Sequence, residues 1–511
     1  MWACLATSLF AAGQATHVVV VVWDGMRPDF VSEKTTPVLF KLAAEGVTFD
    51  HHHCAYISST EVNGAVLATG VYPEHNGIIG NREFRPAIDP TNRIMTAELR
   101  AVRRGDGLSG NHFLGFATLA ETLHARGLRT AVAGAKTVTL LQDRNAQDAA
   151  GLGVDVFEGD AVPPAILKTI ERALGKFPPV SLPKLQRDAW TTRALTGPLW
   201  DPEVPPFSLL WLSEPDFSQH ETGPGSPTAL AALKSSDDNL GRLLGALEAK
   251  GLRDQTDVIV VSDHGFSTIS ENIDLAAILR TNGFHAGREF ASANPQPGQI
   301  LVVGNGGTVF LYVAGHDAAF IGRLAHFLQT QPFCGVVFSR VHVEGTFPLV
   351  AARINSPDAP DLALSMHWRP DRSTNGTPGL VCSDYGQYGP GGGMHASLSP
   401  FDLHNTGIAA GPDFRRGSHD PLPTGNIDIA PTVLYLLGVK PRARLDGRVL
   451  TEALVSANAP EPSVTPRHLE ASYRGDNFTW HQYLNSWEVN GVVYFDEGDG
   501  SRGAAGKPAG N

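Results

Sequence analysis

The 511-residue sequence has only four cysteines, at positions 4, 54, 334 and 382, and no Cys-x-x-Cys pair. It therefore lacks the spacing of a cysteine zinc site, and whether Cys334 and Cys382 are bridged stays open. Runs of basic residues are also absent, and the formal net charge is −12. This balance argues against a nucleic-acid-binding surface, which needs clustered lysines and arginines. An anionic small molecule would have to be attracted by local cations, which points toward bound metal.

Long apolar segments are missing as well. Beyond the N-terminus, no stretch approaches the roughly 18 uninterrupted apolar residues of a membrane span, so we predict none. Residues 1–15 are apolar and rich in small residues, which is typical of the later part of a secretory signal, although a basic start is lacking. We interpret them as a truncated signal segment rather than an ordinary N-terminal arm. A secreted protein, periplasmic or extracellular, is therefore expected.

Three apolar segments each lead into an aspartate. Residues 18–23 lead to Asp24, residues 207–212 to Asp216, and residues 258–261 to Asp263. Apolar runs without alternation are typical of parallel strands that are covered on both faces. In open α/β sheets, ligands bind at the carboxyl ends of such strands. We therefore expect the three carboxylates to meet at one edge of a sheet.

Segments with helical and strand-like patterns alternate along most of the chain. Helical spacing occurs over residues 36–46, 58–69, 116–126, 229–250 and 427–438, and further short strands are expected over 47–50, 130–134 and 406–410. This alternation predicts an α/β fold, a three-layer α/β/α sandwich around a largely parallel central sheet. The predicted core comprises residues 16–282 and 385–455.

The pattern changes outside this core. Residues 283–384 contain expected strands over 307–313 and 335–343 and a helix over 318–328, which indicates an inserted α+β subdomain. Residues 456–497 are interpreted as a C-terminal hairpin extension, because Asn490-Gly491 is a strong hairpin-turn signal. The glycine-rich residues 498–511 are expected to form a disordered tail.

Histidines accompany the carboxylates at the strand ends. Carboxylates close together repel one another unless a cation lies between them. A mixed set of carboxylates and imidazoles suits zinc, and three of each suffice for two three-ligand sites. A single such residue is more often a helix cap, an ion-pair partner or a core histidine, so the prediction rests on the whole set. The candidate ligands are Asp24, Asp216, His220, Asp263, His264 and His395.

The triplet His51-His52-His53 is a different case. Successive residues of a strand face opposite sides, so three neighbours cannot easily share one ion. We interpret the triplet as a solvated or hydrogen-bonded strand end, not as a metal site.

Thr60 allows two interpretations. Ser58-Ser59-Thr60-Glu61 fits the start of a helix with a capping box from Ser58 to Glu61. A hydroxyl at a helix N-terminus also lies where backbone N–H groups favour phosphate, and a metal would lower its pKa and make it a nucleophile. Asn63 lies three residues on, on the same side. The residues alone leave both interpretations open.

Five motifs, in this order, resemble the alkaline phosphatase superfamily, and within it the type I phosphodiesterases and nucleotide pyrophosphatases. They are residues 22–27, residues 59–63 with 68–78, residues 214–220, residues 262–265 and residues 393–395. The resemblance extends from about residue 18 to residue 450. It implies an alkaline phosphatase-like fold and metal-dependent hydrolysis of a small-molecule phosphate ester.

The resemblance also implies roles for individual residues. By this similarity, one Zn²⁺ is held by Asp216, His220 and His395. A second Zn²⁺ is held by Asp24, Asp263 and His264 and also binds Thr60. Thr60 is then the nucleophile that forms a phospho-threonine intermediate, and Asn63 stabilises charge on the non-bridging oxygen.

Several alternatives stay open. Ser59 and Glu61 stand where nucleotide pyrophosphatases often carry lysine and an aromatic residue, so nucleotide specificity is undecided. A phosphonate hydrolase or a phosphomonoesterase of the same superfamily is the main alternative. A non-catalytic binding protein with this fold is less favoured, because no ligand or nucleophile is missing. No sulfatase formylglycine motif or Gly-x-Ser-x-Gly elbow occurs, and the oligomeric state is not predicted.

Overall fold

The computed structural model describes residues 13–144, 151–384, 386–456 and 460–504. Its core is a nine-stranded sheet with the order β21-β2-β20-β9-β1-β8-β5-β6-β7. The strands are β1 (His17–Trp23), β2 (Val47–His53), β5 (Thr130–Gly134), β6 (Gly153–Phe157), β7 (Asp160–Val162), β8 (Phe207–Leu212), β9 (Thr256–Val261), β20 (Gly407–Ala410) and β21 (Ser418–Gly425). In this sheet β20 and β7 run antiparallel to their neighbours, and the other pairs are parallel. The sheet is thus largely parallel, as predicted.

The valine-rich strand β1 lies at the centre of this sheet. It pairs in parallel with β8 on one side and β9 on the other. Residues 18–23 are all buried, and alternate valines pack into hydrophobic cores on opposite faces of the sheet. A strand without a solvent-facing side has no reason to alternate apolar with polar residues. This explains its uninterrupted run of valines.

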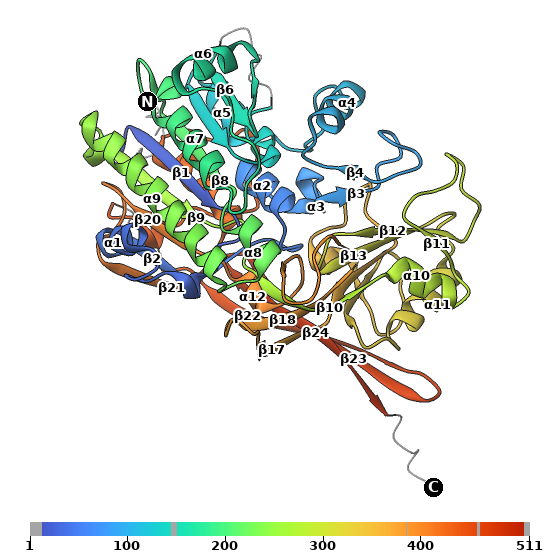
Figure 1. Cartoon of the computed structure of the whole chain (residues 1–511). Coiled ribbons are helices and arrows are strands. Elements are labelled where there is room, and N and C mark those ends of the chain that lie inside the picture. The colour runs from blue at the N-terminus through green and yellow to red at the C-terminus, as the bar shows by residue number, and fades with distance from the viewer. Residues whose placement is uncertain (1–12, 145–150, 385, 457–459, 505–511) are drawn as a thin grey trace, which may run out of the picture.

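Helices cover both faces of the sheet, which gives the predicted three-layer α/β/α sandwich (Figure 1). One layer contains α1 (Pro37–Glu45), α6 (Ala165–Leu174), α7 (Leu185–Thr196), α8 (Asp216–Thr222) and α9 (Pro227–Ala249). The other contains α2 (Thr60–Thr69), α5 (Leu119–His124) and α13 (Ile429–Leu436). The fold class predicted from the sequence is therefore confirmed.

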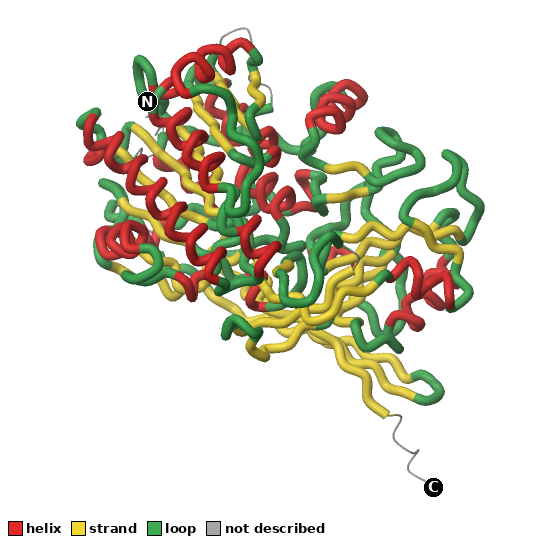
Figure 2. The backbone as a smooth tube through the Cα atoms, viewed as in Figure 1, coloured by secondary structure: helices red, strands yellow, loops and turns green. Residues whose placement is uncertain are grey.

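The inserted region forms a second, smaller sheet. Its order is β11 (His285–Gly287), β12 (Gln299–Gly304), β13 (Thr308–Val313), β16 (Leu362–Met366), β14 (Cys334–Ser339) and β15 (Phe347–Pro348). The helices α10 (Leu275–Thr281) and α11 (Ala318–Leu328) also pack in this region. A four-stranded sheet of β17 (Trp368–Arg372), β18 (Pro378–Asp384), β10 (Ser267–Ile273) and β19 (Gly393–Met394) joins it to the core. Helices and strands occur in both regions (Figure 2).

The C-terminal segment differs from its prediction. It forms an antiparallel three-stranded sheet of β22 (Val464–Arg474), β23 (Phe478–Val489) and β24 (Val492–Ala504), not a single hairpin. The Asn490-Gly491 turn is confirmed, with both residues at positive φ. The predicted disorder is wrong for residues 498–504, and residues 505–511 lie outside the described range. The glycines there permit close packing, since a Cβ at Gly500 would collide with the Gly335 carbonyl and the Trp480 ring.

Residues 81–115 form a polar segment that contains some regular structure. It contains the short strands β3 (Arg82–Glu83) and β4 (Ile94–Met95) and the helix α4 (Leu99–Ser109), and it follows the short helix α3 (Pro73–Asn76). A further short helix, α12 (Pro400–Leu403), precedes β20.

Three sequence expectations concern the termini, the cysteines and the membrane. Of the predicted signal segment, residues 1–12 lie outside the described range, whereas the amides of Gln14 and Ala15 donate to Asp413. Cys334 and Cys382 are buried free thiols.

None of the described helices combines the length and the apolar character that crossing a membrane requires.

Candidate active site and metal centre

Three neighbouring strands bring the predicted aspartates together. Asp24 follows β1, Asp216 begins α8 shortly after β8, and Asp263 follows β9. Because β8, β1 and β9 are adjacent and parallel, their carboxyl ends share one edge of the sheet. All three carboxylates are buried.

The predicted histidines lie among these carboxylates. The Nε2 atom of His264 lies 3.3 Å from Asp263 Oδ2, 3.7 Å from Asp24 Oδ1 and 3.9 Å from Asp216 Oδ1. The Nε2 atoms of His220 and His395 lie 3.2 Å and 3.7 Å from Asp216 Oδ1. The structure thus gathers all six candidate ligands at one centre.

Hydrogen bonds orient the three imidazoles in the same way. The Nδ1 atoms of His220, His264 and His395 lie 2.9, 2.8 and 2.9 Å from the backbone carbonyls of Gly393, Gly265 and Ser58. A carbonyl only accepts, so each Nδ1 carries a hydrogen, and a ring in its neutral form then presents an Nε2 lone pair to the centre. Burial lowers the pKa of His264 and of His395, which favours the neutral ring. Such orientation is typical of metal-ligating histidines.

The carboxylates leave acceptor atoms without donors. Asp24 Oδ1, Asp216 Oδ1 and Asp263 Oδ2 are buried and have no hydrogen-bond partner among the described residues. Burial, together with the charge of Asp263, raises the pKa of Asp24, and burial raises the pKa of Asp263 to about 7. Unsatisfied buried acceptors are costly, and a bound cation removes that cost. The donor set therefore fits divalent metal.

Two overlapping groups place their ligand atoms within 4.8 Å of one another. One consists of Asp24, Asp263 and His264, and the other of Asp216, His264 and His395. His220 belongs to neither group, although it contacts Asp216. Asp24, Asp263 and His264 are the same three residues that the sequence resemblance assigns to the second Zn²⁺. The division of ligands between two ions stays a prediction.

Lys136 is a residue of the centre that sequence reasoning missed. It follows β5, and its Nζ lies 2.9 Å from both Asp24 Oδ2 and Asp216 Oδ2. Burial alone would lower the pKa of Lys136, but the two carboxylates raise it well above its usual value. The available signal was its position just beyond a predicted strand. Because β5 neighbours β8, its end reaches the same edge of the sheet.

We expect Lys136→Met to destabilise the metal-free protein by about 3 kcal/mol. The substitution removes the positive charge that lies between the buried carboxylates of Asp24 and Asp216, which are then left without a cationic partner. Denaturant unfolding in the presence of a chelator measures this loss, and added Zn²⁺ should reduce it. Lys234→Met is the matched control, because Lys234 pairs with Asp238 at the surface. Equal losses in the two variants would contradict the assignment.

Thr60 lies next to this centre. It is the first residue of α2, and its Oγ1 lies 3.2 Å from His264 Nε2. The predicted capping box is wrong, because the N-cap is Ser59 and no side chain caps the helix. Ser58 Oγ donates instead to the carbonyl of Ser397. The Thr60 hydroxyl is therefore not engaged in capping.

The side chain of Asn63 makes hydrogen bonds to the loop that precedes Thr60. Its Nδ2 donates to the carbonyls of Ala55 and Ser59, and its Oδ1 accepts from the amide of Ala55. The predicted role in stabilising charge on a substrate stays a prediction. Asn81, which sequence reasoning missed, also lies beside the start of α2, because its Oδ1 accepts a hydrogen bond from the amide of Glu61 at 3.0 Å.

The sequence matches the model of the type I phosphodiesterase/nucleotide pyrophosphatase family over residues 18–367. The chain belongs to this family. The matched range includes Asp24, Thr60, Asp216 and Asp263, whereas His395 lies beyond it and is joined to the centre by the tertiary structure.

About a quarter of the aligned residues are identical between this chain and known proteins of this type. A mouse (Mus musculus) bis(5'-adenosyl)-triphosphatase is 27% identical over 274 residues, which cover 52% of each chain. A venom phosphodiesterase of Naja atra is 24% identical over 50% of this chain and 27% of its own length. The chain thus spans about half or less of these relatives. The solved structure of murine ectonucleotide pyrophosphatase/phosphodiesterase 5 matches the family fold with a TM-score of 0.60 and 17% identity, over 86% of this chain and 100% of the other.

Proposed function

We propose that this family member hydrolyses small-molecule phosphate esters as a phosphodiesterase or nucleotide pyrophosphatase, with Thr60 as the nucleophile and two Zn²⁺ ions as cofactors. The observation that carries the proposal is the position of the Thr60 hydroxyl, at a helix N-terminus and 3.2 Å from Nε2 of His264, one of the candidate ligands. The names of similar proteins, a bis(5'-adenosyl)-triphosphatase and a venom phosphodiesterase, support the proposal. A threonine-to-alanine variant of the murine structural neighbour is described as inactive and was solved in complex with AMP.

The six carboxylate and imidazole residues of the centre would hold the metal. When bound, two ions would supply positive charge for the attacking and leaving oxygens and would lower the pKa of a coordinated hydroxyl. Hydrogen bonds from the chain itself orient two of these carboxylates. Trp211 Nε1 donates to Asp24 Oδ2 at 2.7 Å, and the amide of Gly25 donates to Asp263 Oδ1 at 3.0 Å.

The chain's own groups account for the chemistry at phosphorus. Thr60 Oγ1 forms a bond to phosphorus as the bond to the leaving-group oxygen breaks, and the hydroxyl proton of Thr60 passes through solvent to the leaving-group oxygen. Backbone N–H groups in the first turn of α2 favour the charged phosphoryl oxygens. Asn81 is held beside that turn and can offer its Nδ2 hydrogens. Water then hydrolyses the phospho-threonine and restores the hydroxyl.

Two observations favour the second candidate, a phosphomonoesterase or phosphonate hydrolase. The Lys136 ammonium adds a cation to the centre, and it is 23% exposed. Glu61, next to the nucleophile, is a carboxyl whose pKa burial raises to about 7, and it offers no ring on which a nucleobase could stack. An additional cation suits a phosphoryl group that carries an additional negative charge.

A single preparation tests these functions. We expect it to hydrolyse an aryl phosphodiester, to lose this activity with a chelator and to regain it with Zn²⁺. An aryl phosphomonoester and a phosphonate, assayed alongside, decide between the candidates. Failure to turn over any of the three after Zn²⁺ is restored would contradict the enzyme proposal. Export to the periplasm or the extracellular space stays a prediction.

A further inference from the structure

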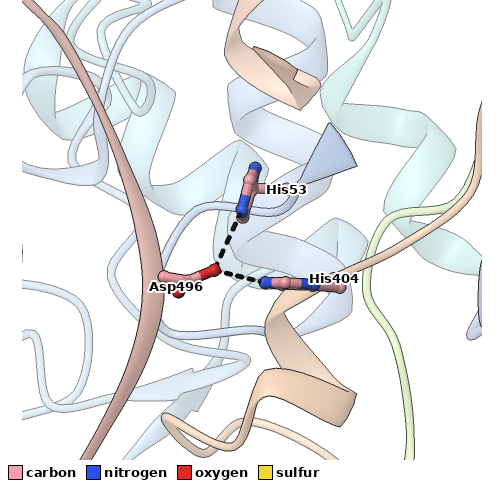
Figure 3. A group of neighbouring side chains, drawn as sticks. All are labelled: His53, His404 and Asp496. Atoms are coloured by element: carbon pink, nitrogen blue, oxygen red, sulfur yellow. Dashed lines mark hydrogen bonds and ion pairs between the residues drawn. The ribbon is translucent and has the colours of Figure 1, made fainter. Parts of the chain in front are cut away.

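A second group of metal-ligating side chains lies outside the candidate active site. His53 is the last residue of β2, His404 follows α12, and Asp496 lies on β24. Both imidazoles point toward the Asp496 carboxylate (Figure 3). His404 Nε2 lies 2.7 Å from Asp496 Oδ1 and His53 Nε2 lies 3.7 Å from the same oxygen. The three candidate ligand atoms lie within 4.8 Å of one another.

The orientation of His53 is the key observation. Its Nδ1 lies 3.1 Å from the carbonyl of Thr424, which can only accept, so Nδ1 carries the hydrogen. Its Nε2 is buried, has no hydrogen-bond partner among the described residues and faces Asp496. In a neutral ring this Nε2 presents a lone pair toward a carboxylate oxygen. Two acceptors that face each other in this way are favourable only if a proton or a cation lies between them.

A bound proton does not explain this arrangement well. Only 1% of the His53 side chain is exposed, and a charged ring buried so deeply is costly. The same arrangement, with Nδ1 bonded to a carbonyl and Nε2 presented to carboxylates, orients the three histidines of the candidate active site.

His404 and Asp496 give an ion access to the group. Their side chains are 30% and 31% exposed, so the site is open to solvent on one side. In the hydrogen-bonded state, His404 Nε2 donates to Asp496. An ion that binds there takes the Nε2 lone pair, so the Nε2 hydrogen passes to solvent while Nδ1 takes up a hydrogen from solvent; the neutral ring changes tautomer with no net release of a proton.

We propose that His53, His404 and Asp496 form a binding site for a divalent transition-metal ion, with Zn²⁺ as the preferred ion. Two imidazole nitrogens, one carboxylate oxygen and an open position form a typical zinc ligand set, whereas Ca²⁺ and Mg²⁺ prefer oxygen ligands. Ligands around a tetrahedral Zn²⁺ lie about 3.4 Å apart. The distance of 3.7 Å between His53 and Asp496 needs only a small adjustment.

The site would link the C-terminal sheet to the core. Its ligands come from β2 in the central sheet, from the segment before β20 and from β24, and β24 packs against both β2 and α12. His53 and His404 already form a backbone bridge. An ion that binds only when these segments are assembled stabilises the folded chain. The proposal does not depend on the proposed enzymatic activity.

Zinc content per chain tests the site. Protein equilibrated with Zn²⁺ and then desalted is analysed for wild type, His404→Ala, Asp496→Asn and the control His419→Ala. His419 is an exposed histidine, and its aspartate partner, Asp50, lies 2.8 Å away. We expect wild type and His419→Ala to hold one zinc per chain more than His404→Ala and Asp496→Asn. Equal zinc content in all four proteins would overturn the proposal, and the active-site ions cancel in this comparison.

Thermal unfolding separates loss of the ion from loss of the fold. Asp496→Asn keeps an acceptor for His404 and adds a donor for His53, so its metal-free Tm should equal or exceed that of wild type. Adding Zn²⁺ should raise the Tm of wild type more than that of Asp496→Asn. An equal rise in the two proteins would show that the three side chains form only a hydrogen-bonded group.

Discussion

Thr60→Ala is expected to lower kcat for phosphate-ester hydrolysis by roughly 10³- to 10⁶-fold, because removing a nucleophile abolishes the covalent route. The structure indicates that this substitution removes the hydroxyl without removing a cap of α2. Thr60 does not cap α2, and its hydroxyl contacts His264. Zinc content should therefore stay nearly unchanged. Steady-state rates with an aryl phosphodiester and elemental analysis of the same samples measure both quantities.

Thr60→Ser is the matched control. It keeps a hydroxyl at the same position and should retain far more activity than the alanine variant. A Thr60→Ala protein with the rate of wild type would refute the nucleophile. A loss of zinc that equals the loss of rate would mean that Thr60 acts mainly as a ligand.

His395→Ala is expected to remove one zinc and to lower the rate by more than the roughly 10- to 100-fold that is typical for loss of an outer-shell partner. The His395 ring stacks on His264 with centroids 3.7 Å apart, and its Nε2 faces Asp216. Without this imidazole, the group around Asp216 loses one of its nitrogen ligands. Elemental analysis and turnover by the same protein check both effects.

His52→Gln serves as the control for a buried histidine. The two ring nitrogens of His52 contact Thr424 and Asn426 rather than the centre. Zinc content and rate should therefore be kept, even if stability falls. Retention of both ions by His395→Ala would show that the predicted ligand set is wrong.

Local patterns predicted the core strands well. The valine run of β1 and the apolar segments of β8 and β9 are buried on both faces, so their composition carries the signal directly. The three aspartates that end these segments could be assigned to one edge because parallel neighbours end together. The Asn490-Gly491 turn was predictable because it depends on two adjacent residues at positive φ.

Predictions failed where a residue's partner lies far away in the sequence. Ser58 was expected to cap its own helix, but its hydroxyl binds the carbonyl of Ser397. Residues 498–504 look disordered by composition, yet they form part of β24, where glycine allows close contact with Trp480. In both cases a long-range contact outweighs a local preference.

The sequence by itself determined where the central strands lie along the chain, their burial and the residue types at their carboxyl ends. Those properties follow from local composition and periodicity. Only the tertiary structure decided which polar atoms meet. It placed Lys136 between two carboxylates, turned Asn63 toward the backbone, and joined His53 to His404 and Asp496. The physical reason is that a hydrogen bond or a ligand contact depends on the spatial position of its partner, which local patterns do not encode.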